Sequence, residues 1–183
     1  MSNYPGAAVS SRLTPAQRKS VLQVEREVAE LYLDHDTLVF VLGSFDDGKK
    51  HRLENFCGLT NSRPLNNAAA RLMDEFLEDA DRELQSNHKF KVLALHADAI
   101  VGVAEDDQGG FVMEQGILVD NPNLLDKTYL LRRNYGDDGN REKYCWMQNG
   151  FFTELNNRNQ VYDWGLGNSF DDSAREVLDD LGL

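Results

Sequence analysis

The chain has 183 residues, 41% of them hydrophobic, which is enough for one domain with a full core and short for two. Its 31 acidic and 19 basic residues give a net charge of −12, which disfavours nucleic acids and anionic membranes as partners. The acidic residues are spread along the chain, so we expect a salt-adapted, halophilic protein whose self-repulsion is screened at high ionic strength.

The cysteines and histidines do not show the spacing of a metal site. Cys57 and Cys145 are far apart in the sequence, so we predict no disulfide framework, no metal and no cofactor. The N-terminus lacks a signal pattern, and no apolar run approaches the length of a membrane span. A cytoplasmic location is expected.

The N-terminal part is predicted to be a flexible arm followed by a helix. Residues 1–13 are small and polar, without periodicity. Thr14 and Gln17 have the spacing of a capping box, with Pro15 at the first helical position. Apolar residues then recur at helical spacing over 15–33. We therefore divide 14–183 into an N-terminal helix within 14–35 and an α/β core over 37–183.

The run 38–42 is continuously apolar, which is typical of a central parallel strand. Gly43 and Ser44 follow it, and the next residues include the densest cationic cluster of the chain, with Lys49, Lys50 and Arg52. Such a loop can hold an anion through backbone N–H groups with a cation behind them. It can equally be a solvated surface turn, and both interpretations stay open.

A second helix is predicted to begin at Pro64 and to continue to about residue 84. Its apolar residues recur at helical spacing and form an expected core stripe of Leu65, Ala68, Leu72, Met73, Phe76, Ala80 and Leu84. Residues 90–95 are too few for periodicity to decide between a strand and a helix.

The most informative stretch is 97–119. It combines an apolar strand over 99–104, an acidic glycine-containing loop and a helix from about Val112, with Glu114 on the first turn. Ligands of open parallel sheets bind beyond the carboxyl ends of the strands, so Glu114 is the first candidate for catalysis. A surface glutamate favoured by the helix dipole is the alternative. Gly109 and Gly110 clear the approach, and Gly116 allows close packing or a nearby ligand.

The remaining segments predict strands over 127–132 and 161–164, an irregular helix over 146–156 and a last helix capped at Ser169. Strands that alternate with helices favour an α/β fold. We expect a single-domain, three-layer parallel sheet of four to five strands, flavodoxin-like or Rossmann-like, with the extra N-terminal helix.

Four segments carry a family resemblance: Leu-Gly-Ser-Phe after the first strand, Ala-Asp-Ala-Ile-Val-Gly-Val, Gly-Gly-Phe-Val-Met-Glu-Gln-Gly and Lys-Thr-Tyr-Leu-Leu-Arg. Together they resemble the nucleoside 2-deoxyribosyltransferase superfamily, and the branch of the 2′-deoxynucleoside 5′-phosphate N-hydrolases most closely. The similarity runs from 38 to about 178. The TIR-like NAD hydrolases share a similar sheet and also use a glutamate.

The resemblance implies an N-glycosidase or deoxyribosyltransferase that acts on a small-molecule nucleoside or nucleotide. Glu114 matches the nucleophile, and Ser44 matches a serine that donates to a 5′-phosphate or sugar hydroxyl. Met147 matches a residue that reaches into the site of a neighbouring subunit, which implies a homodimer. The remaining expected substrate-binding residues are Gly43, Gln108, Gly109 and Gly110. Asp98 matches a structural aspartate.

The chain also departs from the pattern of that superfamily. Phe40 stands where a tyrosine orients the glutamate, and Asn87 where an aspartate handles the proton of the leaving base. Gln108 stands where a serine or aspartate is expected. General acid catalysis typically contributes about 10²- to 10⁴-fold. A catalytically degenerate nucleotide-binding or protein-interaction module of the same fold is therefore the second hypothesis.

Overall fold

The structure, a computed structural model, describes residues 13–63, 67–76, 86–107 and 111–183. In this part of the chain, five parallel strands form one sheet in the order β2-β1-β3-β4-β5. Their bounds are Thr37–Gly43 (β1), Ala68–Leu72 (β2), Ala99–Ala104 (β3), Thr128–Asn134 (β4) and Val161–Gly165 (β5). The order is that of flavodoxin-like folds and confirms the predicted architecture.

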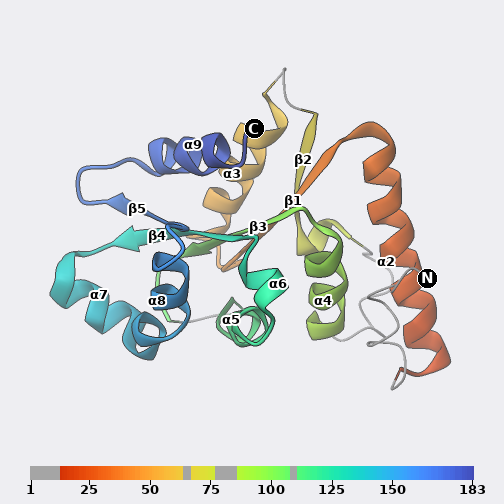
Figure 1. The fold of residues 1–183 in the computed structure, drawn as a ribbon, viewed down its shortest axis with the longest axis horizontal. Helices are drawn as coiled ribbons and strands as arrows, with labels where there is room; N and C mark the ends of the chain where they lie inside the picture. Colours follow the sequence, from red (N-terminus) through yellow and green to blue (C-terminus); the bar gives the residue numbers. More distant parts are fainter. Residues whose placement is uncertain (1–12, 64–66, 77–85, 108–110) are drawn as a thin grey trace.

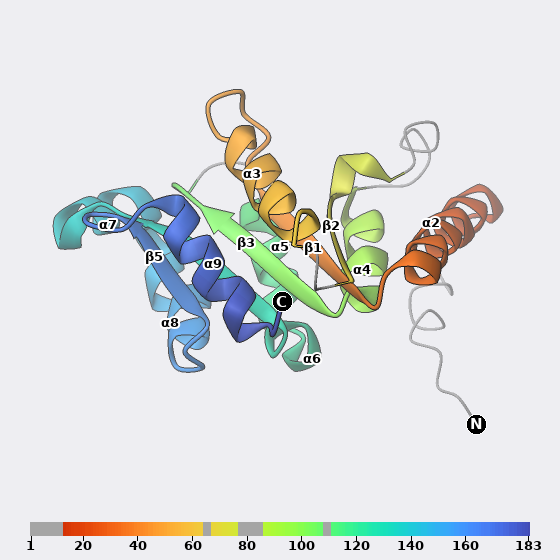
Figure 2. The ribbon, with the colours of Figure 1, turned by 90° about the horizontal axis from the view of Figure 1, so that it is seen from above.

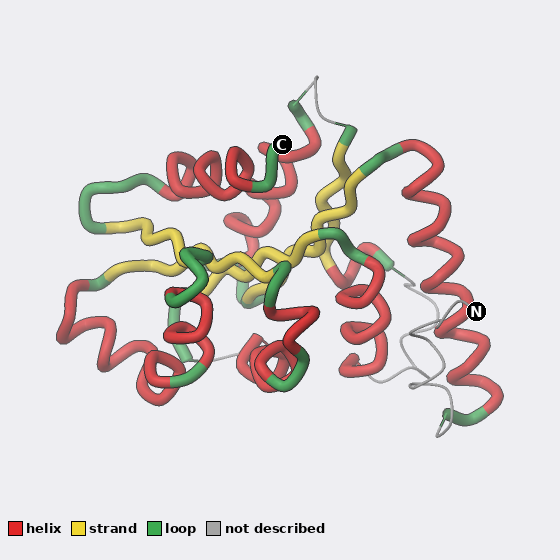
Figure 3. The backbone as a smooth tube through the Cα atoms, viewed as in Figure 1, coloured by secondary structure: helices red, strands yellow, loops and turns green. Residues whose placement is uncertain are grey.

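Helices cover both faces of the sheet (Figures 1 and 3). One face is covered by α3 (Lys50–Asn61) and α9 (Phe170–Asp180). The other is covered by α4 (Ser86–His96), α5 (Phe111–Val119), α6 (Pro122–Leu125) and α8 (Phe151–Asn156). Side chains of β1 alternate between the two cores, with Phe40 in one and Val39 and Val41 in the other. Because both faces are covered, β1 is a continuous apolar run.

The N-terminal helix α2 (Pro15–Asp34) lies beside α4 at one end of the molecule (Figures 1 and 2). Its capping box is present as predicted. The side-chain hydroxyl of Thr14 accepts a hydrogen bond from the backbone N–H of Gln17, and the side-chain oxygen of Gln17 accepts one from the backbone N–H of Thr14. Val24 and Val28 are buried, which anchors the helix on the core. Along the described residues, no helix is long and apolar enough to cross a membrane.

The prediction of a helix from Pro64 to about residue 84 is wrong for the residues of this range that the structure describes, 67–76. Ala68–Leu72 is strand β2, and Met73–Glu75 is the short 3-10 helix η1. The register of β2 runs from Thr37 opposite Ala68 to Val41 opposite Leu72. Alanine has the highest helix propensity, but tertiary pairing with β1 overrides this local preference. Leu65, Ala80 and Leu84 of the predicted stripe lie outside the described residues.

The structure also shows the secondary structure of segments that the sequence left open or predicted differently. Residues 90–95, ambiguous in the sequence, lie within helix α4. The sequence did not predict helix α3 or helix α7 (Gly136–Tyr144). The irregular helix expected over 146–156 is split into the 3-10 helix η2 (Cys145–Asn149) and α8. The last helix is capped by Ser169, as predicted.

Candidate functional site

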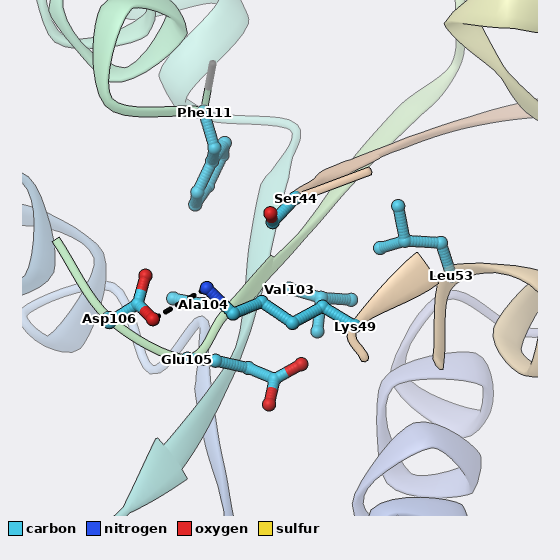
Figure 4. A pocket seen from close by; sticks show the side chains of 8 residues that line it. All are labelled: Ser44, Lys49, Leu53, Val103, Ala104, Glu105, Asp106 and Phe111. Carbon is cyan, nitrogen blue, oxygen red and sulfur yellow. Dashed lines mark hydrogen bonds and ion pairs between the residues drawn. The ribbon is translucent and has the colours of Figure 1, made fainter. Parts of the chain in front are cut away.

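The strand order creates one topological switch point, between β1 and β3. From β1 the chain continues through α3 to β2, and from β3 it continues through α5 to β4, on the opposite side. Ligands of open α/β sheets bind outside the carboxyl ends of the strands at such a point. A pocket lies there, lined by the described residues Ser44, Lys49, Leu53, Val103, Ala104, Glu105, Asp106 and Phe111 (Figure 4).

This switch-point pocket is narrow. Its cavity volume of about 10 Å³ is enough for about one water molecule. Two glycines explain the tight packing around it. A Cβ atom on Gly43 would lie 2.6 Å from Cδ2 of Leu53, and one on Gly102 would lie 2.4 Å from Cζ of Phe111. Gly43 therefore lets β1 pack against α3 and β3, and Gly102 lets the ring of Phe111 lie across β3.

Carboxylates neutralise the lysines of the cationic cluster, of which Lys49 ends the loop after β1 and Lys50 begins α3. Nζ of Lys49 lies 2.6 Å from Oδ2 of Asp106 and 3.4 Å from Oδ2 of Asp46. Burial by itself lowers the pKa of Lys49, but the hydrogen bonds and attraction of the two aspartates raise it overall. Nζ of Lys50 lies 2.9 Å from Oδ2 of Asp74. An anionic ligand at this loop would have to replace a carboxylate.

A second charged cluster lies beside the pocket on the α3 and α9 face. Nη1 of Arg52 lies 2.8 Å from Oε1 of Glu105, and Nη1 of Arg133 lies 3.4 Å from Oε2 of the same carboxylate. The guanidinium carbons of Arg52 and Arg133 lie 4.8 and 5.2 Å from the ring centroid of Trp164. Glu105 is 7% exposed, so its charge is compensated by guanidinium groups rather than by water.

Sequence reasoning missed this cluster. Glu105 follows directly after the apolar strand β3, and that position at a strand end was the available signal. Its partners come from α3 and from β4, which no local pattern connects.

Glu114 lies on the first turn of α5, three residues after Phe111. Its side chain is partly buried, and burial raises its pKa to about 7. Glu114 is not among the described residues that line the switch-point pocket, which Phe111 and Ser44 do line. The following residue, Gln115, is 1% exposed, and neither amide atom of its side chain has a hydrogen-bond partner among the described residues.

The other expected substrate-binding residues are placed as follows. Gln108, Gly109 and Gly110 lie outside the described residues. Met147 is 0% exposed and belongs to the buried cluster of its own chain, so as placed it is a core residue rather than one presented to a second subunit. A Cβ atom on Gly116 would meet no described atom within 4 Å, so close packing does not explain that glycine.

Of the three departures from the superfamily pattern, Phe40 and Asn87 lie in the described part of the chain. Phe40 is buried with its ring centroid 6.0 Å from that of Phe90, as an ordinary core contact. Asn87 is exposed near the start of α4. Asp98 accepts from the backbone N–H of Leu38 and from the hydroxyl of Tyr32, both at 2.8 Å, which is the structural role that the resemblance implies. The described residues contain no group of three side chains that could hold a metal ion.

Comparison with known proteins gives one family. None of the curated proteins matches the chain. Residues 10–143 match a family model described as a family of unknown function, DUF8170, and this match covers more than half of the chain. The chain therefore belongs to this family, whose function is unknown.

Proposed function

We propose that the protein processes a nucleoside or nucleotide at the switch point of its sheet, cleaving or exchanging the N-glycosidic bond with Glu114 as nucleophile. The observation that supports this most is the position of Glu114 on the first turn of α5 together with its raised pKa of about 7. Strongly perturbed carboxylates beside a switch point are candidates for catalysis. The resemblance to the nucleoside 2-deoxyribosyltransferases supports the same role.

The proposed reaction has two steps. An oxygen of ionised Glu114 attacks the anomeric carbon, the C–N bond breaks, and the base leaves with the bonding electrons and takes up a proton from water. Water or a second base then attacks the same carbon and releases the Glu114 carboxylate. With a pKa of about 7, about half of the Glu114 side chains are ionised at neutral pH.

Substrate entry requires the switch-point pocket to widen, because its present volume suits about one water molecule. The hydroxyl of Ser44 would donate to a sugar hydroxyl or 5′-phosphate at the end of β1. Lys49 could then exchange its bond to Asp106 for one to the phosphate. We also propose that the protein is a homodimer in a salt-rich cytoplasm. Light scattering after size-exclusion chromatography tests the homodimer.

Two observations favour a second candidate, a binding or interaction module without catalysis. Phe40 has no hydroxyl to orient Glu114 and is held in the core against Phe90. Asn87 cannot act as an acid and is exposed. Loss of the proton donor would remove one of the usual contributions to cleavage of the glycosidic bond.

The test is an assay for free base. The pure protein is incubated at high salt with deoxynucleotides, nucleosides and NAD, and released base is measured by chromatography. The proposal expects release with at least one compound, its loss in Glu114→Gln, and its retention in Glu176→Gln, a change at an exposed glutamate on α9. If no compound yields base, catalysis is rejected. Thermal stabilisation by one of the same compounds would then support the binding module.

A further inference from the structure

A larger hollow lies away from the switch-point pocket, where the end of β4 meets α7, η2 and α8. Figure 1 shows α7 and α8 next to each other below β4 and β5. The cavity volume is about 340 Å³, within the range of about 300 to 1,000 Å³ typical of small-molecule sites. None of its lining residues lines the switch-point pocket, so it would be a separate site.

Carboxamides dominate the lining of this α7–α8 hollow: Asn140, Gln148, Asn149 and Asn156 all contribute. Each carboxamide has one oxygen that accepts and an NH₂ group that donates two hydrogen bonds. A hydroxyl group likewise donates one bond and accepts others. The lining therefore matches a ligand that carries several hydroxyl groups.

The charged side chains of the hollow balance one another. Arg132 binds Asp163 through two bonds, Nε to Oδ1 at 2.6 Å and Nη2 to Oδ2 at 2.7 Å. The hydrogen bond to Asp163 raises the pKa of Arg132, so this guanidinium stays charged and paired. Arg141 and Asp137 add one positive and one negative charge. An anion, which only accepts hydrogen bonds, would offer no donor to the carboxamide oxygens of Gln148, Asn149 and Asn156, so a neutral ligand fits better.

Two of the lining side chains are held in place before any ligand binds. Oδ1 of Asn140 accepts from the backbone N–H of Tyr135 at 2.9 Å, and its Nδ2 donates to Oδ1 of Asn134 at 3.1 Å. The guanidinium of Arg132 is fixed by Asp163 and lies 5.8 Å from the ring centroid of Phe152. Side chains held in this way lose little conformational entropy on binding.

From the volume, the carboxamides and the balanced charge, we propose that the α7–α8 hollow binds a neutral polyhydroxylated molecule of the size of a monosaccharide. This site does not depend on the function proposed for Glu114.

The test titrates the full chain with ribose, glucose and myo-inositol and follows ¹H–¹⁵N NMR shifts. We expect saturable shifts of amides in α7, η2 and α8 with at least one of the three. Asn149→Ala and Asn156→Ala, both at exposed positions, should each weaken binding about 3- to 10-fold through the loss of a hydrogen bond. Asn157→Ala is the matched control, because Asn157 is exposed and does not line the hollow.

Other outcomes would overturn the inference. One is that none of the three compounds shifts these amides in the wild-type chain. Another is that the two lining variants bind the compounds as tightly as the Asn157→Ala control. A third is that inorganic phosphate or acetate binds at these residues and the three polyols do not, which would make the hollow an anion site.

Discussion

Glu105 and Arg52 form a two-oxygen contact at the carboxyl end of the sheet, with Nη1 of Arg52 at 2.8 Å from Oε1 and 2.9 Å from Oε2 of Glu105. The contact joins α3 to the residue that follows β3, next to the switch-point pocket. Because Glu105 is buried, this pair fixes the start of α3 against the end of β3 at the edge of the proposed site.

Arg52→Met should lower the free energy of unfolding by about 3 kcal/mol, because it leaves a buried carboxylate with only the longer contact to Arg133. Urea denaturation measures the change. Arg175→Met, which removes an exposed ion pair to Asp172, should cost less than about 1 kcal/mol. If the double variant Arg52→Met with Glu105→Leu is no more stable than Arg52→Met alone, the buried charge is not the cause.

Gly102→Ala should destabilise the fold by about 1 to 3 kcal/mol, because its Cβ atom would collide with the ring of Phe111 at the start of α5. Gly116→Ala, in the same helix as Phe111, has open space and should stabilise by up to about 1 kcal/mol through helix propensity. Thermal and urea unfolding of both variants provide the comparison. Equal effects of the two substitutions would contradict the packing described for Phe111.

Tyr32→Phe should cost about 1 kcal/mol of stability. The hydroxyl of Tyr32 lies 2.8 Å from both the carbonyl oxygen of His96 and Oδ2 of Asp98, and it ties α2 to the start of β3. Leu33→Ala, at a position that is 83% exposed on the same helix, should change stability by less than about 0.5 kcal/mol. If Tyr32→Phe lowers the free energy of unfolding as little as Leu33→Ala does, the hydroxyl of Tyr32 makes no net contribution to stability.

Glu114 should make stability depend on pH between about 4.5, its ordinary pKa, and about 7, its pKa in the fold. Below this window the group is protonated in both states. As pH rises through it, the unfolded chain loses the proton first, so the free energy of unfolding falls, by on the order of 3 kcal/mol. Glu114→Gln should remove this fall. The free energy of unfolding of the variant minus that of the wild type should therefore be larger at pH 8 than at pH 4. A constant difference between the two proteins across the window would refute the raised pKa.

Added potassium chloride should raise the midpoint of urea unfolding, because the net charge of −12 repels itself less when it is screened. Sucrose, which stabilises by exclusion from the protein surface and not by screening, is the control. A protein that is equally stable at low and high ionic strength would rule out the salt adaptation expected from the composition.

The sequence by itself determined the elements whose signals are local. Continuous apolar runs predicted β1 and β3, and the capping box at Thr14 predicted the start of α2. Glu114 was placed correctly on the first turn of a helix, because a glycine-containing loop and an apolar pattern adjoin it. These features depend on neighbours within a few residues, which the sequence displays directly.

Only the tertiary structure decided β2 and the charged clusters. The three alanines in Ala68–Leu72 favour a helix locally, and pairing with β1, about thirty residues earlier, selects the strand instead. Arg52, Glu105 and Arg133 lie on separate elements and meet because parallel strands end at one edge of the sheet. Long-range contacts of this kind are set by topology, and the order of residues along the chain does not display them.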